Sequence, residues 1–170
     1  NQIEIDHYVD KAKLLLEKNI TPIVTFHHFT TPEWLMKDGL WASENSTIAF
    51  VKYVDKMMQH LPKEVTLYNT INEPGIFSMF GYLSKMKFPP GVQNEKTFIK
   101  ASNNIITAHK QSMKKIKEHN PNAKVGMTHA LHEWDDNDTS VQKEYIKYHM
   151  EDKFLYASDE DDFIALQTYS

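Results

Sequence analysis

Helical and strand patterns alternate along this whole chain, and that alternation constrains its fold more than any other feature. Apolar residues recur at helical spacing from Ile5 to Leu16, from Phe50 to Leu61 and from Phe98 to Ile116, as on the buried face of an amphipathic helix. A fourth, shorter helix is predicted at 140–150. Runs rich in β-branched and apolar residues follow each helix and predict strands at 22–26, 65–71, 123–128 and 163–168.

Helices that alternate with strands in this way predict a parallel sheet with helical crossovers. A closed (β/α)₈ barrel and an open doubly wound sheet share this pattern, so the alternation alone leaves both folds open. Asn19 is expected to end the first helix in the left-handed conformation, and Asn45 or Ser46 to cap the second. The remaining stretches are predicted to be loops: 30–45, 74–91 and the acidic, solvated segment 158–162.

The length and composition of the chain limit what it can be. Its 170 residues suggest one domain, whereas a complete (β/α)₈ barrel needs roughly 250 residues. A barrel fold therefore predicts about half a TIM barrel, with residues 1–170 as a single partial domain.

The net charge of −4 and the absence of a basic stripe disfavour nucleic acid as a partner, and no apolar run is long enough to span a bilayer. The chain has no cysteine, which fits a reducing compartment, and we expect a cytoplasmic location.

Polar residues follow every predicted strand. In parallel α/β folds, functional sites gather at the C-terminal ends of the strands, so these residues are the candidates for chemistry. The residues at the predicted strand starts are ordinary by comparison. In chain order, the strands lead into His27 and His28, Asn72 and Glu73, Thr128 and His129, and Gln167 and Tyr169.

Glu73 is the strongest catalytic candidate. It directly follows an apolar strand and precedes Pro74, and a proline disfavours helical backbone at the residue before it. Burial at a strand end would disfavour the charged form of a carboxyl group, which suits a general acid. A glutamate held in a salt bridge is the structural alternative and would be favoured for an isolated Glu. The neighbouring Asn72 and the other polar strand ends bring the catalytic interpretation closer to it.

Each remaining candidate also has a structural alternative. His28 could donate to substrate hydroxyls or be a buried histidine whose hydrogen bonds are made by the backbone, and Tyr169 could hold a partner carboxylate or be a core aromatic with a polar tip.

Residues 129–138 offer imidazoles and carboxylates as possible metal ligands, but no second cluster completes a tetrahedral site. We therefore expect no metal and no other cofactor. Five aromatic residues in predicted loops could stack on sugar rings or simply pack the loops: Trp34, Trp41, Phe77, Phe80 and Tyr82.

Four segments, in order, resemble motifs of glycoside hydrolase family 1. Residues 25–32, Thr-Phe-His-His-Phe-Thr-Thr-Pro, are similar to its third-strand motif, and residues 70–74, Thr-Ile-Asn-Glu-Pro, match its Asn-Glu-Pro signature. Residues 81–82 with 88–91 look like the loop that follows. Residues 162–169 resemble the sixth-strand motif, which normally ends in Asn-Tyr-Tyr. The ordered set is specific, and it covers nearly the whole chain.

The resemblance implies a retaining β-glycosidase, most similar to a β-glucosidase, to which this chain contributes barrel strands three to six. It implies that Glu73 is the acid/base, that Asn72 and His28 bind hydroxyls of one sugar, and that Tyr169 supports the nucleophile. The family's nucleophilic glutamate belongs to the seventh strand, beyond Ser170, so this chain is expected to carry one of two catalytic carboxylates. By itself it is then expected to be inactive.

The partners that the resemblance implies are a β-glycoside or oligosaccharide substrate and either the remainder of the barrel or another copy. A non-catalytic half-barrel that binds sugar or assembles with a partner chain is the alternative reading. Two departures from the family pattern stand within the motifs. Gln167 replaces the usual Asn, which predicts an altered network near Tyr169. Gly75 replaces a residue that is often bulky, which predicts a roomier leaving-group site.

Overall fold

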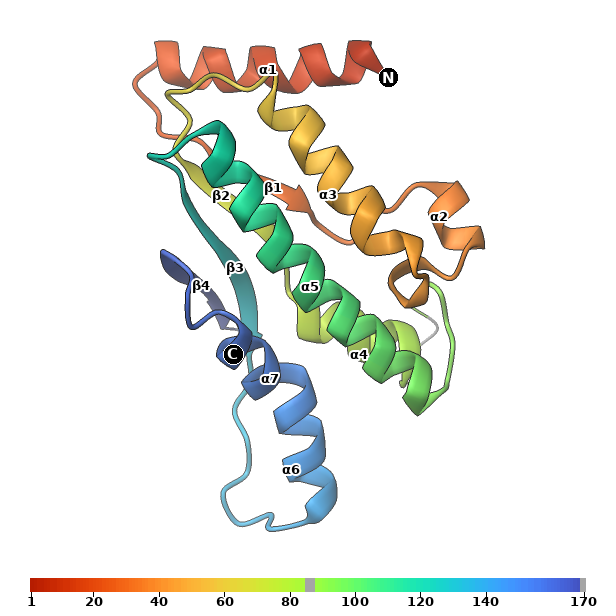
Figure 1. The fold of residues 1–170 in the computed structure, drawn as a ribbon. Coiled ribbons are helices and arrows are strands. Elements are labelled where there is room, and N and C mark those ends of the chain that lie inside the picture. The colour runs from red at the N-terminus through yellow and green to blue at the C-terminus, as the bar shows by residue number, and fades with distance from the viewer. Residues whose placement is uncertain (85–87, 169–170) are drawn as a thin grey trace.

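The computed structural model describes residues 1–84 and 88–168, and it contains one parallel sheet packed against helices (Figure 1). The strands lie in the order β1-β2-β3-β4, and each is parallel to its neighbour. A doubly wound sheet reverses its strand order at a switch point, whereas the order here is consecutive, as in a barrel. The chain is a partial α/β barrel. The strands are β1 (Ile23–His27), β2 (Leu67–Asn72), β3 (Lys124–Leu131) and β4 (Phe163–Thr168).

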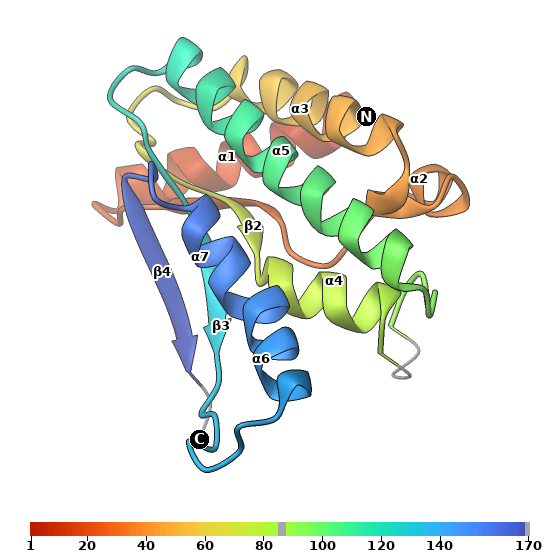
Figure 2. The same ribbon diagram turned by 60° about the horizontal axis from the view of Figure 1, so that its bottom comes forward.

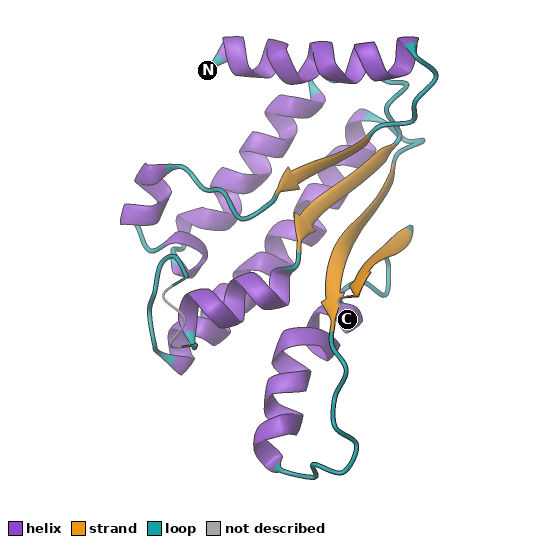
Figure 3. Ribbon diagram, turned by 180° about the vertical axis from the view of Figure 1, so that it is seen from behind, coloured by secondary structure: helices purple, strands orange, loops and turns teal. Residues whose placement is uncertain are grey.

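Helices connect consecutive strands and cover one face of the sheet. Seen from behind, the strands lie in front and the long helices α3 and α5 lie beyond them (Figure 3). The opposite face of the sheet carries no helix within the described part of the chain. The main helices are α1 (Gln2–Glu17) before β1, α3 (Asn45–Met58) before β2, α5 (Glu95–His119) before β3, and then α6 (Val141–Lys147), the π-helical η2 (Tyr148–Asp152) and α7 (Lys153–Ala157) before β4.

The hydrophobic core lies between the sheet and α3 and α5. Val54, Phe98, Ile105 and Val125 are fully buried there. Each such side chain contributes about 1.5–3 kcal/mol relative to an exposed one. This burial follows from the apolar stripes of the two long helices, and it confirms the reading of their periodicity.

Two segments predicted to be loops contain helices, so those predictions are wrong. Residues 30–45 include α2 (Glu33–Lys37) and the 3₁₀ turn η1 (Leu40–Ala42), which are too short to show a helical period. Residues 74–91 begin with α4 (Pro74–Tyr82), of which seven of nine residues are buried. A helix buried nearly all round has no polar face, so its sequence shows no amphipathic pattern.

Two predictions about helix ends have different outcomes. Asn19 takes the left-handed conformation with φ 56°, as expected. Neither Asn45 nor Ser46 is the N-cap of α3, because that position is Glu44 and its side chain makes no capping bond. The hydroxyl of Ser43 instead accepts from the backbone N–H of Asn45 at 3.1 Å.

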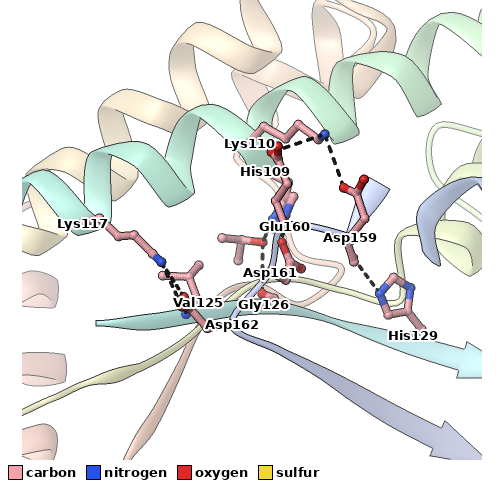
Figure 4. Close-up of polar contacts among 12 residues, drawn as sticks. His109, Lys110, Lys117, Val125, Gly126, His129, Asp159, Glu160, Asp161 and Asp162 are labelled. Carbon is pink, nitrogen blue, oxygen red and sulfur yellow. Dashed lines mark hydrogen bonds and ion pairs between the residues drawn. The ribbon is translucent and has the colours of Figure 1, made fainter. Parts of the chain in front are cut away.

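The acidic segment 158–162 is only partly a solvated loop. Asp159 and Glu160 are exposed, but the side chain of Asp161 is fully buried. Its carboxylate lies 2.8 Å from Nε2 of His109 in α5, and the other ring nitrogen of His109 lies 2.7 Å from the hydroxyl of Thr70 in β2 (Figure 4). The sequence prediction for Asp161 is wrong because its partner stands 52 residues away.

Asp162 makes the second anchor of this segment. One carboxylate oxygen accepts from the backbone N–H of Val125 in β3 at 2.9 Å, and Lys117 of α5 lies 2.8 Å from the carboxylate (Figure 4). These contacts fix the start of β4 at the N-terminal end of the sheet. In barrels that end serves stability, and the opposite end carries the active site.

Candidate active site

The backbone around Glu73 takes an unusual conformation at the end of β2. Glu73 has φ 45° and ψ 59°, in the left-handed region. Pro74, the first residue of α4, disfavours the right-handed region for Glu73, and a left-handed non-glycine residue costs about 1–3 kcal/mol. The Glu73 N–H donates to the carbonyl of Thr128 in β3 at 2.8 Å, and its own carbonyl accepts from the Phe77 N–H at 3.0 Å. Since Glu73 is only 7% exposed, strand, helix and neighbouring strand together fix its place.

Asn72 belongs to the face of the sheet that no described helix covers. The pairing of β2 with β3 shifts register between Asn69 and Asn72. Asn69 donates to the Thr25 hydroxyl of β1 at 3.4 Å, and Asn72 accepts from Gln167 of β4 at 3.2 Å, whereas Thr70 between them contacts α5. An irregularity of this kind re-aims a strand's side chains. It brings both asparagines to the same side.

The two histidines at the end of β1 have opposite surroundings. His27 is buried, and its ring lies 5.3 Å from Trp41 and 5.1 Å from Phe77 between ring centroids. Burial, with a smaller effect from the neighbouring His28, lowers the pKa of His27 to about 4. His28 is exposed and packs edge-on against Phe29 at 5.2 Å. His28 is therefore the histidine of this pair that a solute can reach.

Two hollows lie along the free edge of β1. One has a volume of about 570 Å³ between α1, α3 and the loop after β1, and its lining includes His27 but neither Asn72 nor Glu73. His28 lines the other, of about 390 Å³. Asn72 and Glu73 are adjacent at the end of β2, and Gln167 connects β4 to them. Tyr169 lies outside the described residues, so the shared cavity of the four predicted residues stays a prediction.

Most of the aromatic residues considered for sugar stacking belong to the core. Trp41, Phe77 and Tyr82 are at most 2% exposed, and the Tyr82 hydroxyl donates to the carbonyl of Gly39 at 3.2 Å. Only the packing reading fits these three residues. Trp34, on α2, is 59% exposed.

Gly75 does not create room for a leaving group, and that expectation is wrong. A Cβ atom at this position would lie 1.8 Å from the backbone carbonyl oxygen of Met150. Glycine is needed because the π-helical segment η2 packs directly on the first turn of α4. Nothing in the local sequence identifies this contact, since the two residues come from different crossovers.

A polar cluster past the end of β3 was not predicted from the sequence. The buried carboxylate of Glu151 accepts hydrogen bonds from the backbone N–H and Nδ1 of His132, both at 2.8 Å, and from the indole N–H of Trp134 at 2.9 Å. The available signal was the histidine-rich and acid-rich segment 129–138, which suggested metal ligands. Among the described residues, no group of three or more His, Asp and Glu could hold a metal ion.

The described part of the chain also has no helix that is long and apolar enough to cross a membrane. Its sheet has consecutive parallel strands, and a buried Asn-Glu pair ends one of them at the edge where barrel enzymes carry out their chemistry. The fold is that of part of a (β/α)₈ barrel.

Comparison with known proteins identifies the family. The model of glycosyl hydrolase family 1 matches residues 1–160, and the chain belongs to this family. It is 31% identical to β-glucosidase A of Acetivibrio thermocellus over 127 residues, which cover 75% of the chain and 28% of the relative. It is 35% identical to a 6-phospho-β-galactosidase of Staphylococcus epidermidis over 133 residues, which cover 77% of the chain and 28% of that relative. The chain thus spans less than a third of either protein.

Solved structures agree with the barrel fold. The β-glycosidase from Pyrococcus horikoshii superposes with a TM-score of 0.85 at 28% identity, over 100% of this chain and 44% of that one. The resemblance to family 1 and the prediction of a partial barrel are both confirmed.

Proposed function

We propose that this chain supplies strands three to six of a retaining β-glycosidase in which Glu73 is the acid/base. The observation that carries the proposal is the buried Glu73, held directly after Asn72 at the C-terminal end of β2. In a retaining mechanism such a carboxylic acid protonates the leaving oxygen while a second carboxylate attacks the sugar. The same residue then takes a proton from the water that releases the sugar.

Asn72 and His28 are the proposed sugar-binding residues. Asn72 accepts from Gln167, and its buried Nδ2 has no acceptor within the described part of the chain. A sugar hydroxyl could supply one, and a buried unsatisfied donor is otherwise costly by about 1–3 kcal/mol. His28 is exposed beyond β1. The proposed role of Tyr169, support of the nucleophile, rests on the family resemblance alone.

The substrate class follows from the relatives. Their names describe a β-glucosidase and a 6-phospho-β-galactosidase, so a β-glycoside is supported more firmly than any particular sugar. We favour a β-glucoside, as in the relative from Acetivibrio thermocellus.

The second carboxylate is proposed to come from outside residues 1–170. Retaining hydrolysis needs the two carboxyl groups about 5–5.5 Å apart, and the family places the second one on a seventh strand. β1 and β4 are the outer strands of the sheet, and unpaired strand edges favour association. The remainder of the barrel or another copy is the proposed partner. A purified 170-residue chain that hydrolysed an activated aryl β-glucoside robustly as a monomer would contradict this placement.

Glu73→Gln in the complete enzyme tests the acid role. The variant should lose about 10²–10⁴-fold in kcat/KM on a β-linked disaccharide, because its leaving group must be protonated. An activated aryl β-glucoside needs little protonation and should lose much less. Glu64→Gln, at an exposed position before β2, is the matched control and should change neither rate. Equal losses on both substrates for Glu73→Gln would contradict an acid role.

A further inference from the structure

Glu151 is a buried carboxylate that the proposed chemistry does not use. Its side chain is 6% exposed, yet it lies in η2, on the crossover between β3 and β4. Both of its oxygens are engaged: Oε1 accepts from two N–H groups of His132, and Oε2 accepts from the indole of Trp134. Taking a carboxylate out of water costs several kcal/mol before its hydrogen bonds are counted.

The three bonds fix two rings at the end of β3. The His132 and Trp134 ring centroids lie 6.1 Å apart at 62°. Because Nδ1 of His132 faces Glu151, Nε2 is the ring nitrogen available to a ligand, and 38% of this side chain is exposed. Trp134 is partly exposed with its only polar atom already bonded. The pair offers a hydrogen-bonding atom beside an aromatic surface.

The same segment packs against the helix that starts after Glu73. Met150, next to Glu151, presents its backbone carbonyl to Gly75 so closely that no Cβ fits between them. Figure 2 shows α4 next to the helical segment of α6 and α7, and η2, which joins these two helices, contacts both α4 and β3. A side chain held by Glu151 is therefore placed relative to α4, and so relative to Glu73.

The distance along β3 sets how far the rings lie from the reacting atoms. Glu73 is bonded to the carbonyl of Thr128 at 2.8 Å, and His132 follows Thr128 by four residues. At about 3.3 Å per residue, this puts the His132 backbone roughly 13 Å further along the strand direction. His132 and Trp134 thus lie beyond reach of the bond that is cleaved, on the outer side of the site.

We propose that Glu151 is a positioning residue that holds His132 and Trp134 as a binding wall for the leaving-group side of a β-linked oligosaccharide. This inference rests on the proposed function. Trp134 packs against the face of the second sugar on the leaving-group side, which is not bonded to the cleaved oxygen. Nε2 of His132 forms a hydrogen bond with a hydroxyl of that same sugar. Glu151 touches no substrate itself.

The test compares two substrates in the complete enzyme: an activated aryl β-glucoside, which has no sugar on the leaving-group side, and a β-linked trisaccharide. Trp134→Ala should raise KM for the trisaccharide about tenfold, since loss of about 1.4 kcal/mol of binding is a factor of ten. It should leave kcat on that substrate and both constants for the aryl glucoside within about twofold. Glu151→Gln should reproduce this split with both rings still present. Tyr156→Ala, which removes an exposed aromatic ring from the same crossover, is the matched control and should change neither substrate.

The outcomes separate this inference from the proposed function. A wild-type enzyme that hydrolyses no β-glycoside would overturn the proposed function, and the inference with it. An active wild type in which Trp134→Ala leaves trisaccharide KM unchanged would overturn the inference alone. Equal losses on both substrates with Glu151→Gln would show that Glu151 supports the fold or Glu73 instead, and Trp134→Ala, at a partly exposed position, keeps the test decisive if Glu151→Gln does not fold.

Discussion

His27→Phe should make the protein more resistant to mild acid. His27 is 5% exposed among aromatic rings, its Nδ1 has no partner within the described residues, and Nε2 has only a 3.5 Å contact with Thr31. A phenyl ring of similar shape removes a buried polar group without leaving a new one unsatisfied, which can be neutral or stabilising. At pH 7 the variant should therefore be at least as stable as the wild type.

The size of the acid effect follows from proton linkage. Burial lowers the pKa of His27 from 6.5 to about 4, so between these values the unfolded chain binds a proton more readily than the folded one. The contribution to stability is complete above pH 6.5 and is lost as the pH falls towards 4. With these two values, the wild type loses roughly 2 kcal/mol between pH 7 and pH 5 through His27 alone. Burial also lowers the pKa of His129 to about 4, but that loss is common to both proteins and cancels in the comparison.

The assay is urea unfolding at pH 7 and pH 5, followed by far-ultraviolet circular dichroism. The stability difference between His27→Phe and wild type should grow by roughly 2 kcal/mol at the lower pH. Val54→Ala, which removes buried apolar atoms from α3 without removing a titrating group, is the control and should shift stability equally at both pH values. A His27→Phe difference that is identical at pH 7 and pH 5 would refute the buried, neutral histidine.

Two further predictions concern packing and the buried hydrogen bond between His109 and Asp161. Gly75→Ala should destabilise the protein by about 1–3 kcal/mol or more, because its methyl group meets the backbone of Met150; an unchanged urea midpoint would contradict the contact. Asp161→Ala should cost about 1–3 kcal/mol, since it leaves Nε2 of the buried His109 without its hydrogen-bond partner. Asp159→Ala, at an exposed neighbour, should stay within about 0.5 kcal/mol, and equal effects of the two alanines would show that the buried pair contributes nothing.

The sequence predicts the elements whose patterns are local. The strand at 163–168 has the predicted bounds, and α5 extends the predicted stripe by only a few residues at each end. Such segments carry one buried face, so their periodicity reports their environment. α4 is nearly all buried, and α2 is a single turn and a half, so neither has a period to detect.

The residues of the candidate site also differ in how far the local sequence predicts them. Glu73 could be singled out because its neighbours in the chain, an apolar strand and Pro74, already restrict its backbone. Glu151 could not, because its partners stand 17 and 19 residues away and nothing in a predicted helix marks one glutamate as buried. The burial of Asp161 could not be predicted for the same reason, because its partner His109 lies 52 residues away. A buried charge is defined by what lies across from it, and that information is not in the local sequence.

The contacts that position Glu73 all lie within this chain. Its left-handed turn, the hydrogen bond to Thr128 and the start of α4 all come from β3 and from the crossover between β2 and β3. The distance of about 5–5.5 Å to a second carboxylate cannot arise in that way, because it depends on how far the sheet curves before it closes. Contacts that set the relation of neighbouring crossovers, such as Gly75 with Met150, therefore bear on the proposed chemistry without touching substrate. In the complete barrel that we propose, local contacts orient the proposed acid, and closure of the barrel brings the second carboxylate to it.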